Sequence, residues 1–96
     1  MTPITRMVAE ELNLPWEKLF AGGRAEPIIF ARYVAMVLTM ERRRWSRLQI
    51  ANYFGRKDPE LPTRAVRVLR YREKTDYKLR LQMAELRQKS ENVLLS

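Results

Sequence analysis

The chain of 96 residues contains no cysteine and no histidine. These two absences exclude disulfide bridges, thiolate or imidazole metal sites, and the common catalytic pairs of a nucleophile with an imidazole. Only three glycines are present, and Gly22 and Gly23 are not followed by the Lys and Ser or Thr of a phosphate-binding loop. We therefore expect no enzymatic activity, no metal, no cofactor and no small-molecule substrate.

Long apolar runs are also absent. No uninterrupted apolar stretch approaches the roughly 20 residues that cross a bilayer, and the first residues lack the apolar segment of a signal peptide. The composition is 46% hydrophobic, which suffices for the core of a single modest domain over residues 1–96. We expect a cytoplasmic protein with no membrane partner, and the lack of cysteine fits a reducing compartment.

Acidic side chains are few where basic ones gather. The net charge is +8, and residues 42–80 carry thirteen basic and four acidic side chains, whereas residues 1–41 carry four and five. A positive field concentrated in one region attracts polyanions, of which DNA and RNA are the commonest. The alternative is the solvated surface of an ordinary basic protein.

The spacing of apolar residues predicts an all-α fold, a compact bundle of five to six helices. Helices are expected over 3–12, 15–20 and 28–42, and the third is apolar around most of its girth, which is typical of a central helix. Gly22 and Gly23 predict a flexible loop before it. A long C-terminal helix over about 76–90 either continues from the helix before it or restarts at Asp76, a candidate N-cap.

Residues 46–74 predict a helix-turn-helix. Ser46 and Gln49 form a capping box, in which each side chain satisfies a backbone N–H of the other residue at the start of a short helix. Gly55 suits the left-handed position that follows such a helix. The buried side of the helix is expected to consist of Leu48, Ile50, Ala51 and Phe54.

The start of the second helix of this motif is less clearly marked. Asp58 could cap a helix that starts at Pro59, but Pro62 would then stand on the fourth helical residue, where a missing N–H begins to matter. We favour a turn over 58–61 and a helix from Pro62 to about Lys74, with Ala65, Val68 and Leu69 facing inward. The opposite face is expected to present Thr63, Arg64, Arg67, Arg70, Tyr71 and Lys74.

The second helix of a helix-turn-helix lies in a DNA groove. We expect Arg64 and Arg67 nearest the bases and Arg70 and Lys74 at phosphates. Trp45 either packs beside the capped helix, which we favour, or stacks on a sugar or base. The neighbouring cations are expected to join one continuous basic ridge along the DNA backbone, and they are Arg42, Arg43, Arg44, Arg47, Arg56 and Lys57.

Over residues 4–70 this order of elements resembles the C-terminal duplex-DNA-binding domain of the bacterial replication initiator DnaA. Residues 32–38, Arg-Tyr-Val-Ala-Met-Val-Leu, are similar to the family's Arg-Gln-Ile/Met-Ala-Met-x-Leu helix. The resemblance implies the same fold, double-stranded DNA as the partner, and association with the nucleoid. Without a gap in spacing, it is also carried by Ile4–Glu10, Leu19, Ser46–Ile50, Phe54–Asp58 and Ala65.

The resemblance implies roles for three further residues. Arg24 stands where the family has an arginine in the minor groove, Arg32 where an arginine meets a backbone phosphate, and Asp58 where an aspartate lies near the bases. The family's base-reading His-Thr-Thr is Pro-Glu-Leu at 59–61 here. Because leucine cannot form those hydrogen bonds, we do not expect recognition of the initiator's own target sequence.

Two other functions remain open at this point. The helix-turn-helix could serve as a scaffold whose basic face binds an acidic protein partner, a reading that the residues at 59–61 favour. The same face could instead bind structured RNA, which is also a polyanion. Arg24 could likewise be a loop arginine without a DNA role.

Overall fold

The computed structural model describes residues 1–20 and 24–93, and over these ranges it contains helices and turns without a strand. The all-α prediction is confirmed. The loop predicted at Gly22 and Gly23 lies outside the described residues. In chain order the helices are α1 (Thr2–Glu11), the short 3-10 helix η1 (Trp16–Leu19), α2 (Glu26–Glu41), α3 (Arg47–Tyr53), α4 (Glu60–Thr75) and α5 (Tyr77–Glu91).

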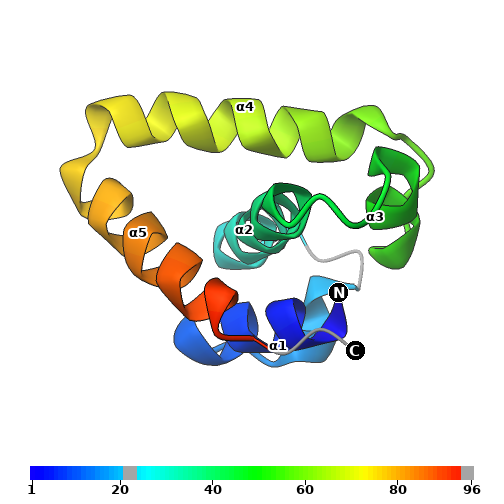
Figure 1. Ribbon diagram of the computed structural model, residues 1–96, viewed down its shortest axis with the longest axis horizontal. Helices are drawn as coiled ribbons and strands as arrows, with labels where there is room; N and C mark the ends of the chain where they lie inside the picture. Colours follow the sequence, from blue (N-terminus) through cyan, green and yellow to red (C-terminus); the bar gives the residue numbers. More distant parts are fainter. Residues whose placement is uncertain (21–23, 94–96) are drawn as a thin grey trace.

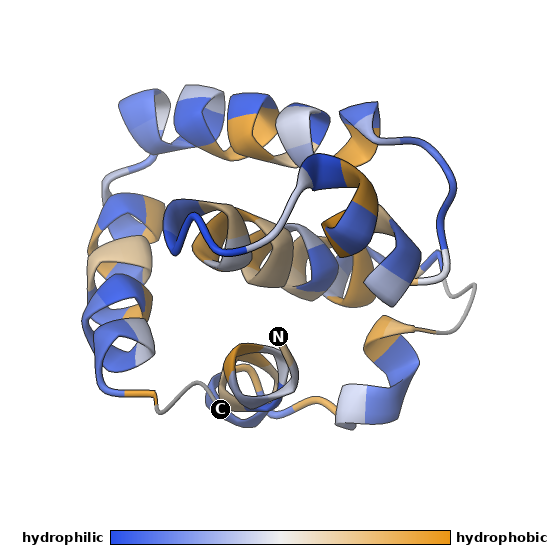
Figure 2. Cartoon of the chain, turned by 45° about the vertical axis from the view of Figure 1, so that its right-hand side comes forward, coloured by the Kyte–Doolittle hydropathy of each residue, from blue (hydrophilic) through white to orange (hydrophobic). Residues whose placement is uncertain are grey.

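Helix α2 is the centre of the molecule. It lies between α4 on one side and α1 on the other, and α3 and α5 stand to the right and left of it in Figure 1. Figure 2 shows hydrophobic colours along much of α2, whereas the surrounding helices also carry hydrophilic stretches. Although α2 is so apolar, no helix within the described ranges has both the length and the hydropathy to cross a bilayer. Its fully buried residues include Ala31, Val34, Ala35, Met36 and Leu38.

Helix α3 starts and ends as its sequence predicts. The Oγ of Ser46 accepts a hydrogen bond from the Gln49 N–H at 3.1 Å, and the Gln49 Oε1 accepts one from the Ser46 N–H at 2.7 Å. Gly55 follows with a φ of 74°, in the left-handed region that glycine adopts without strain. The prediction that Leu48 is buried is wrong, because its side chain is 48% exposed. Leu48 is two residues from Ile50, and such positions lie on nearly opposite sides of a helix.

Helix α4 begins two residues earlier than the sequence predicts. It starts at Glu60, with Pro59 as the N-cap, rather than at Pro62. Asp58 organises this start, because its Oδ1 accepts a hydrogen bond from the Glu60 N–H at 2.9 Å. Pro62 is then the third helical residue, where a backbone N–H has no partner within the helix, so the proline removes no helical hydrogen bond.

Helix α5 restarts after a break, as one of the two expectations states. The Oδ1 of Asp76 accepts a hydrogen bond from the Leu79 N–H at 3.1 Å. Arg87 then joins α5 to two other helices, with Nη1 3.0 Å from the Glu73 carboxylate of α4 and Nε 3.2 Å from the Glu41 carboxylate of α2. The hydrogen bonds with Glu73 raise the pKa of Arg87 although burial opposes the charge. This network holds the end of α4 in place.

Candidate nucleic-acid interface

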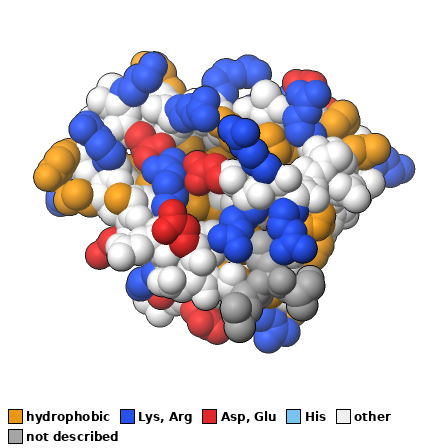
Figure 3. All heavy atoms as spheres, viewed as in Figure 1, with side chains coloured by type: hydrophobic (Ala, Val, Ile, Leu, Met, Phe, Trp, Pro, Cys, Tyr) orange, Lys and Arg blue, Asp and Glu red, His pale blue; other side chains and the backbone are white. Residues whose placement is uncertain are grey.

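The outward side of α4 presents a row of cations. Arg67, Arg70 and Lys74 recur at spacings of three and four residues, which places them on one side of the helix. The other side packs on α2 and α3 through the buried Ala65 and Leu69. Lys and Arg side chains stand along the edge of the molecule where α4 runs (Figure 3).

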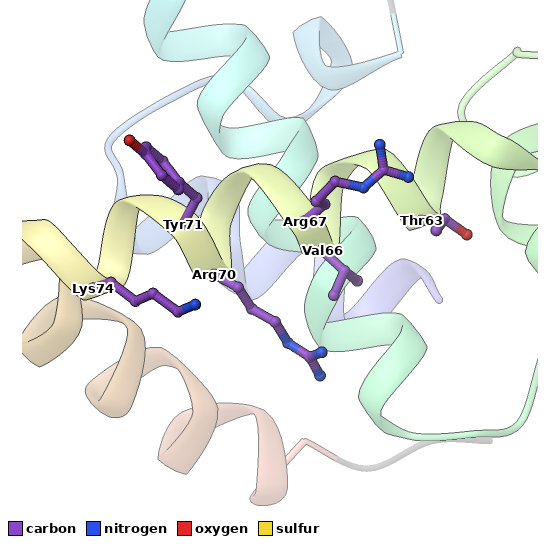
Figure 4. A pocket seen from close by; sticks show the side chains of 6 residues that line it. All are labelled: Thr63, Val66, Arg67, Arg70, Tyr71 and Lys74. Atoms are coloured by element: carbon purple, nitrogen blue, oxygen red, sulfur yellow. The ribbon is translucent and has the colours of Figure 1, made fainter.

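These cations line a surface hollow of about 440 Å³ along α4 (Figure 4). Arg67 extends along the helix toward Thr63, and Lys74 points toward Arg70. Tyr71 is 69% exposed among them. Five of the six side chains that the sequence assigns to this face line the hollow, and Arg64 does not. The sequence prediction missed Val66, which shares the face because it stands three residues after Thr63 and four before Arg70. The lining consists of Thr63, Val66, Arg67, Arg70, Tyr71 and Lys74.

Arg43, in the turn between α2 and α3, joins this face. It lines a second hollow of about 240 Å³ together with Val66 and Arg70 of α4 and with Met40 and Glu41 of α2. Its φ of 57° is in the left-handed region, which non-glycine residues seldom adopt. The turn conformation therefore brings an exposed cation beside Arg70, 27 residues away in the sequence.

Arg47 and Arg64 stand at the N-terminal end of the same face. Arg47 donates a hydrogen bond from Nη1 to the Thr63 Oγ1 at 3.4 Å and lies 3.7 Å from the Glu60 carboxylate. Arg64 lies 3.9 Å from the carboxylate of Asp58. All four charged side chains are more than half exposed, so solvent screens both ion pairs and they contribute little to stability.

The expected single ridge is only partly formed. Arg42 turns away from α4 and donates to the backbone carbonyls of Ser90, in the last turn of α5, and of Val93, just after α5, at 3.2 and 3.4 Å. Arg44 lies over the ring of Trp45, 5.5 Å from its centroid, and near the N-terminal amino group, whose pKa burial and Arg44 both lower. Trp45 itself is partly buried against the core, as favoured.

Three other predicted cations lie outside these hollows. Arg24 is exposed just before α2, and Lys57 is exposed in the turn before α4. Arg56 is half-buried and close enough to Arg32 to lower the pKa of that guanidinium. Asp58 is exposed, and its side chain holds the start of α4.

Arg32 does not lie on the surface, and this corrects the role that the resemblance implies. Its side chain is 5% exposed, and its Nε donates a hydrogen bond to the Leu19 carbonyl at 2.8 Å. Burial lowers the pKa of the guanidinium, and Arg56 adds to that effect. Such a group offers little surface to a DNA phosphate. Instead it ties the end of η1 to α2.

Replacing this buried group is expected to affect folding more than binding. Arg32→Ala should lower the free energy of unfolding by about 1–3 kcal/mol, because the Leu19 carbonyl loses its charged donor. Urea denaturation measures this loss, with the exposed Arg24→Ala as the matched control. If Arg32→Ala instead leaves stability unchanged and makes the salt dependence of DNA binding shallower, the result contradicts the structural role and supports the phosphate contact that the resemblance implies.

No protein-family model matches the chain. A protein named chromosomal replication initiator protein DnaA, from Nautilia profundicola, is 29% identical over 86 residues, which is 90% of this chain and 20% of that protein. The chain is similar to the replication initiator DnaA. A second DnaA, from Sulfurimonas denitrificans, is 34% identical over 55 residues, 57% of this chain and 13% of that protein. The resemblance drawn from the sequence is therefore confirmed.

The similarity concerns a part of each relative. The chain spans about a fifth of the length of the first DnaA and less of the second. The first match includes 86 of the 96 residues of the chain, so it extends beyond any single motif.

Proposed function

We propose that this chain is a double-stranded DNA-binding module in which α4 lies in the major groove and α3 supports it. The observation that carries the proposal is the exposed cationic face of α4. In the described ranges no carboxylate lies within ion-pair distance of Arg67, Arg70 or Lys74. The similarity to proteins named as chromosomal replication initiators supports a role in replication initiation or its regulation, on the nucleoid.

The physical basis is the fit between an α-helix and the major groove. A groove of about 12 Å admits a helix with its side chains. On the free protein the cations of this face repel one another. When they approach phosphates they are attracted instead, and each contact releases condensed counterions from the DNA. Arg43 and Arg47 lie beside α4 at two points along its length, near Arg70 and Thr63, and would hold the DNA backbone there.

The proposed contacts are of three kinds, to bases, to backbone phosphates and in the minor groove. Arg64 and Arg67 lie nearest the bases, and Thr63, Arg70 and Lys74 lie at phosphates. Arg24 enters the minor groove. The remaining cations, Arg44, Arg56 and Lys57, contact the flanking backbone.

Base recognition in this proposal differs from that of the initiator. The first turn of α4 contains Glu60, Leu61 and Pro62, of which only Glu60 can accept a hydrogen bond from a base, from a cytosine amino group. Glu60 is already 3.7 Å from Arg47. The module therefore binds a sequence other than the initiator's target, or binds with little sequence preference.

The test is the affinity of an Arg67 variant. Arg67→Ala is expected to weaken binding to a duplex selected from a random oligonucleotide pool by about 1–3 kcal/mol, because a base contact is lost. Fluorescence anisotropy measures the affinity. The matched control is Lys18→Ala, which removes one exposed cation from η1, on the side of α2 away from α4. Equal affinity for Arg67→Ala and the unchanged chain would contradict the docking of α4.

One observation favours an acidic protein partner instead of DNA. Asp58 and Glu60 place two carboxylates beside Arg64 and Arg47, so part of the positive charge is neutralised at the end that would read bases. Binding to random duplex in low salt separates the two functions. No binding at micromolar protein supports the protein-interaction function, and preference for structured RNA in competition supports RNA.

A further inference from the structure

The cationic surface continues past the end of α4 onto α5. A hollow of about 520 Å³ lies at this junction, lined by Arg70, Glu73 and Lys74 of α4 and by Arg80 of α5. Arg70 and Lys74 also line the hollow along the outward face of α4. The two hollows therefore share a wall, and Arg80 extends the row of cations in the direction of the α4 C-terminus.

The position of Arg80 is set by two contacts. Its Nε donates a hydrogen bond to the Glu73 carbonyl at 3.2 Å, and this carbonyl belongs to the last turn of α4, where carbonyls have no helical donor. Its guanidinium lies 5.7 Å from the centroid of the Tyr77 ring. Asp76 caps α5 just before, so the backbone that carries Arg80 is also held. The side chain thus enters the junction in a defined place.

The charge balance at the junction is positive. Glu73 is the one carboxylate among the four lining residues, and both of its oxygens accept hydrogen bonds from Arg87, at 3.0 and 3.3 Å. No carboxylate of the described residues lies within ion-pair distance of Arg70, Lys74 or Arg80. Lys74 and Arg80 also offset the partial negative charge of the α4 C-terminus, which would otherwise repel an anion.

We propose that Arg80, together with Arg70 and Lys74, forms a subsite for a backbone phosphate of the duplex that α4 binds. This inference rests on the proposed function and adds a contact from α5, outside the helix-turn-helix. The phosphate belongs to the same DNA because the junction is continuous with the face of α4. The bound stretch of backbone is longer than α4 alone would cover.

The absence of cysteine gives a direct test of proximity. Single-cysteine variants Arg80→Cys, Arg67→Cys and Lys18→Cys each carry the only thiol of the chain, to which a photo-cross-linker can be attached. With duplex DNA at low salt, cross-links are expected from positions 80 and 67 and not from position 18. Cross-links from position 67 without any from 80 overturn the subsite alone. Cross-links from neither position overturn the proposed function.

The charge requirement is tested by salt titration. Arg80→Ala is expected to lower the affinity about threefold to tenfold and to reduce the salt slope by about 1, and Arg80→Lys is expected to keep the slope. Because Arg80 also caps α4, circular dichroism must show that both variants are folded at the assay temperature. A slope for Arg80→Ala equal to that of the unchanged chain overturns the phosphate contact. If the salt slope becomes shallower for Arg80→Lys as well, although the positive charge is kept, the charge of Arg80 does not explain the contact and the proposed subsite is overturned.

Discussion

Raising the salt concentration from about 50 to about 200 mM is expected to weaken the binding of this chain to duplex DNA by about 500-fold to 20,000-fold. On the order of five to eight phosphate contacts are expected from the cations assigned to the DNA backbone, which are Arg43, Arg44, Arg47, Arg56, Lys57, Arg70, Lys74 and Arg80. Each contact releases condensed counterions, so the logarithm of the affinity falls linearly with the logarithm of the salt concentration. The outward cations are exposed, so added salt reaches and screens them.

Fluorescence anisotropy with a labelled random duplex at four or five salt concentrations measures this slope. The double variant Arg70→Ala with Lys74→Ala should give a slope shallower by about 2, since two proposed phosphate contacts are removed. Lys18→Ala serves as the control and should leave the slope unchanged. A slope near zero for the unchanged chain would mean that the basic face does not meet a polyanion.

Phe54→Ala is expected to destabilise the fold by about 3–5 kcal/mol, the largest effect on stability that we predict. Phe54 is fully buried, and its ring stacks on Phe20, with centroids 5.5 Å apart and planes at 16°. Tyr53 packs edge-on against the same ring, with centroids 5.1 Å apart. Removing the ring leaves a cavity between η1 and α3, which the surrounding helices cannot fill without losing other contacts.

Urea denaturation followed by circular dichroism measures the loss. Phe54→Leu keeps most of the apolar volume and should cost clearly less than Phe54→Ala. Tyr71→Ala is the matched surface control, because a side chain that is 69% exposed contributes within about 0.5 kcal/mol. A loss below about 1 kcal/mol for Phe54→Ala would show that the aromatic cluster does not hold α3 in place.

Helix boundaries set by local hydrogen bonds could be predicted from the sequence. Two helix starts are of this kind, the capping box of Ser46 and Gln49 and the cap at Asp76. Each hydrogen bond joins residues three positions apart, so the nearby sequence is enough to predict it. The start of α4 was harder, because two prolines and Asp58 competed for the same turn. The prediction weighed the missing N–H of Pro62 as the fourth residue of a helix from Pro59. A start at Glu60 makes Pro62 the third residue, which has no helical hydrogen bond to lose.

The candidate interface was predictable in part. Helical spacing alone placed Arg67, Arg70 and Lys74 on one face, because that spacing repeats with every turn. In a turn, the direction in which a cationic side chain points does not follow a regular spacing along the sequence. Arg43 and Arg44 are neighbours in the chain, yet Arg43 lines the α4 face and Arg44 lies over Trp45.

Local sequence suffices to predict the helical class, the central place of α2, the caps of α3 and α5 and the cationic face of α4, because each depends on residues within a few positions of one another. The packing of distant segments sets the burial of Arg32 against the Leu19 carbonyl, the link that Arg87 makes between three helices, and the place of Arg80 in the same hollow as Lys74 at the end of α4. An arginine side chain is long and has five donors, so its partner depends on which distant surfaces pack around it.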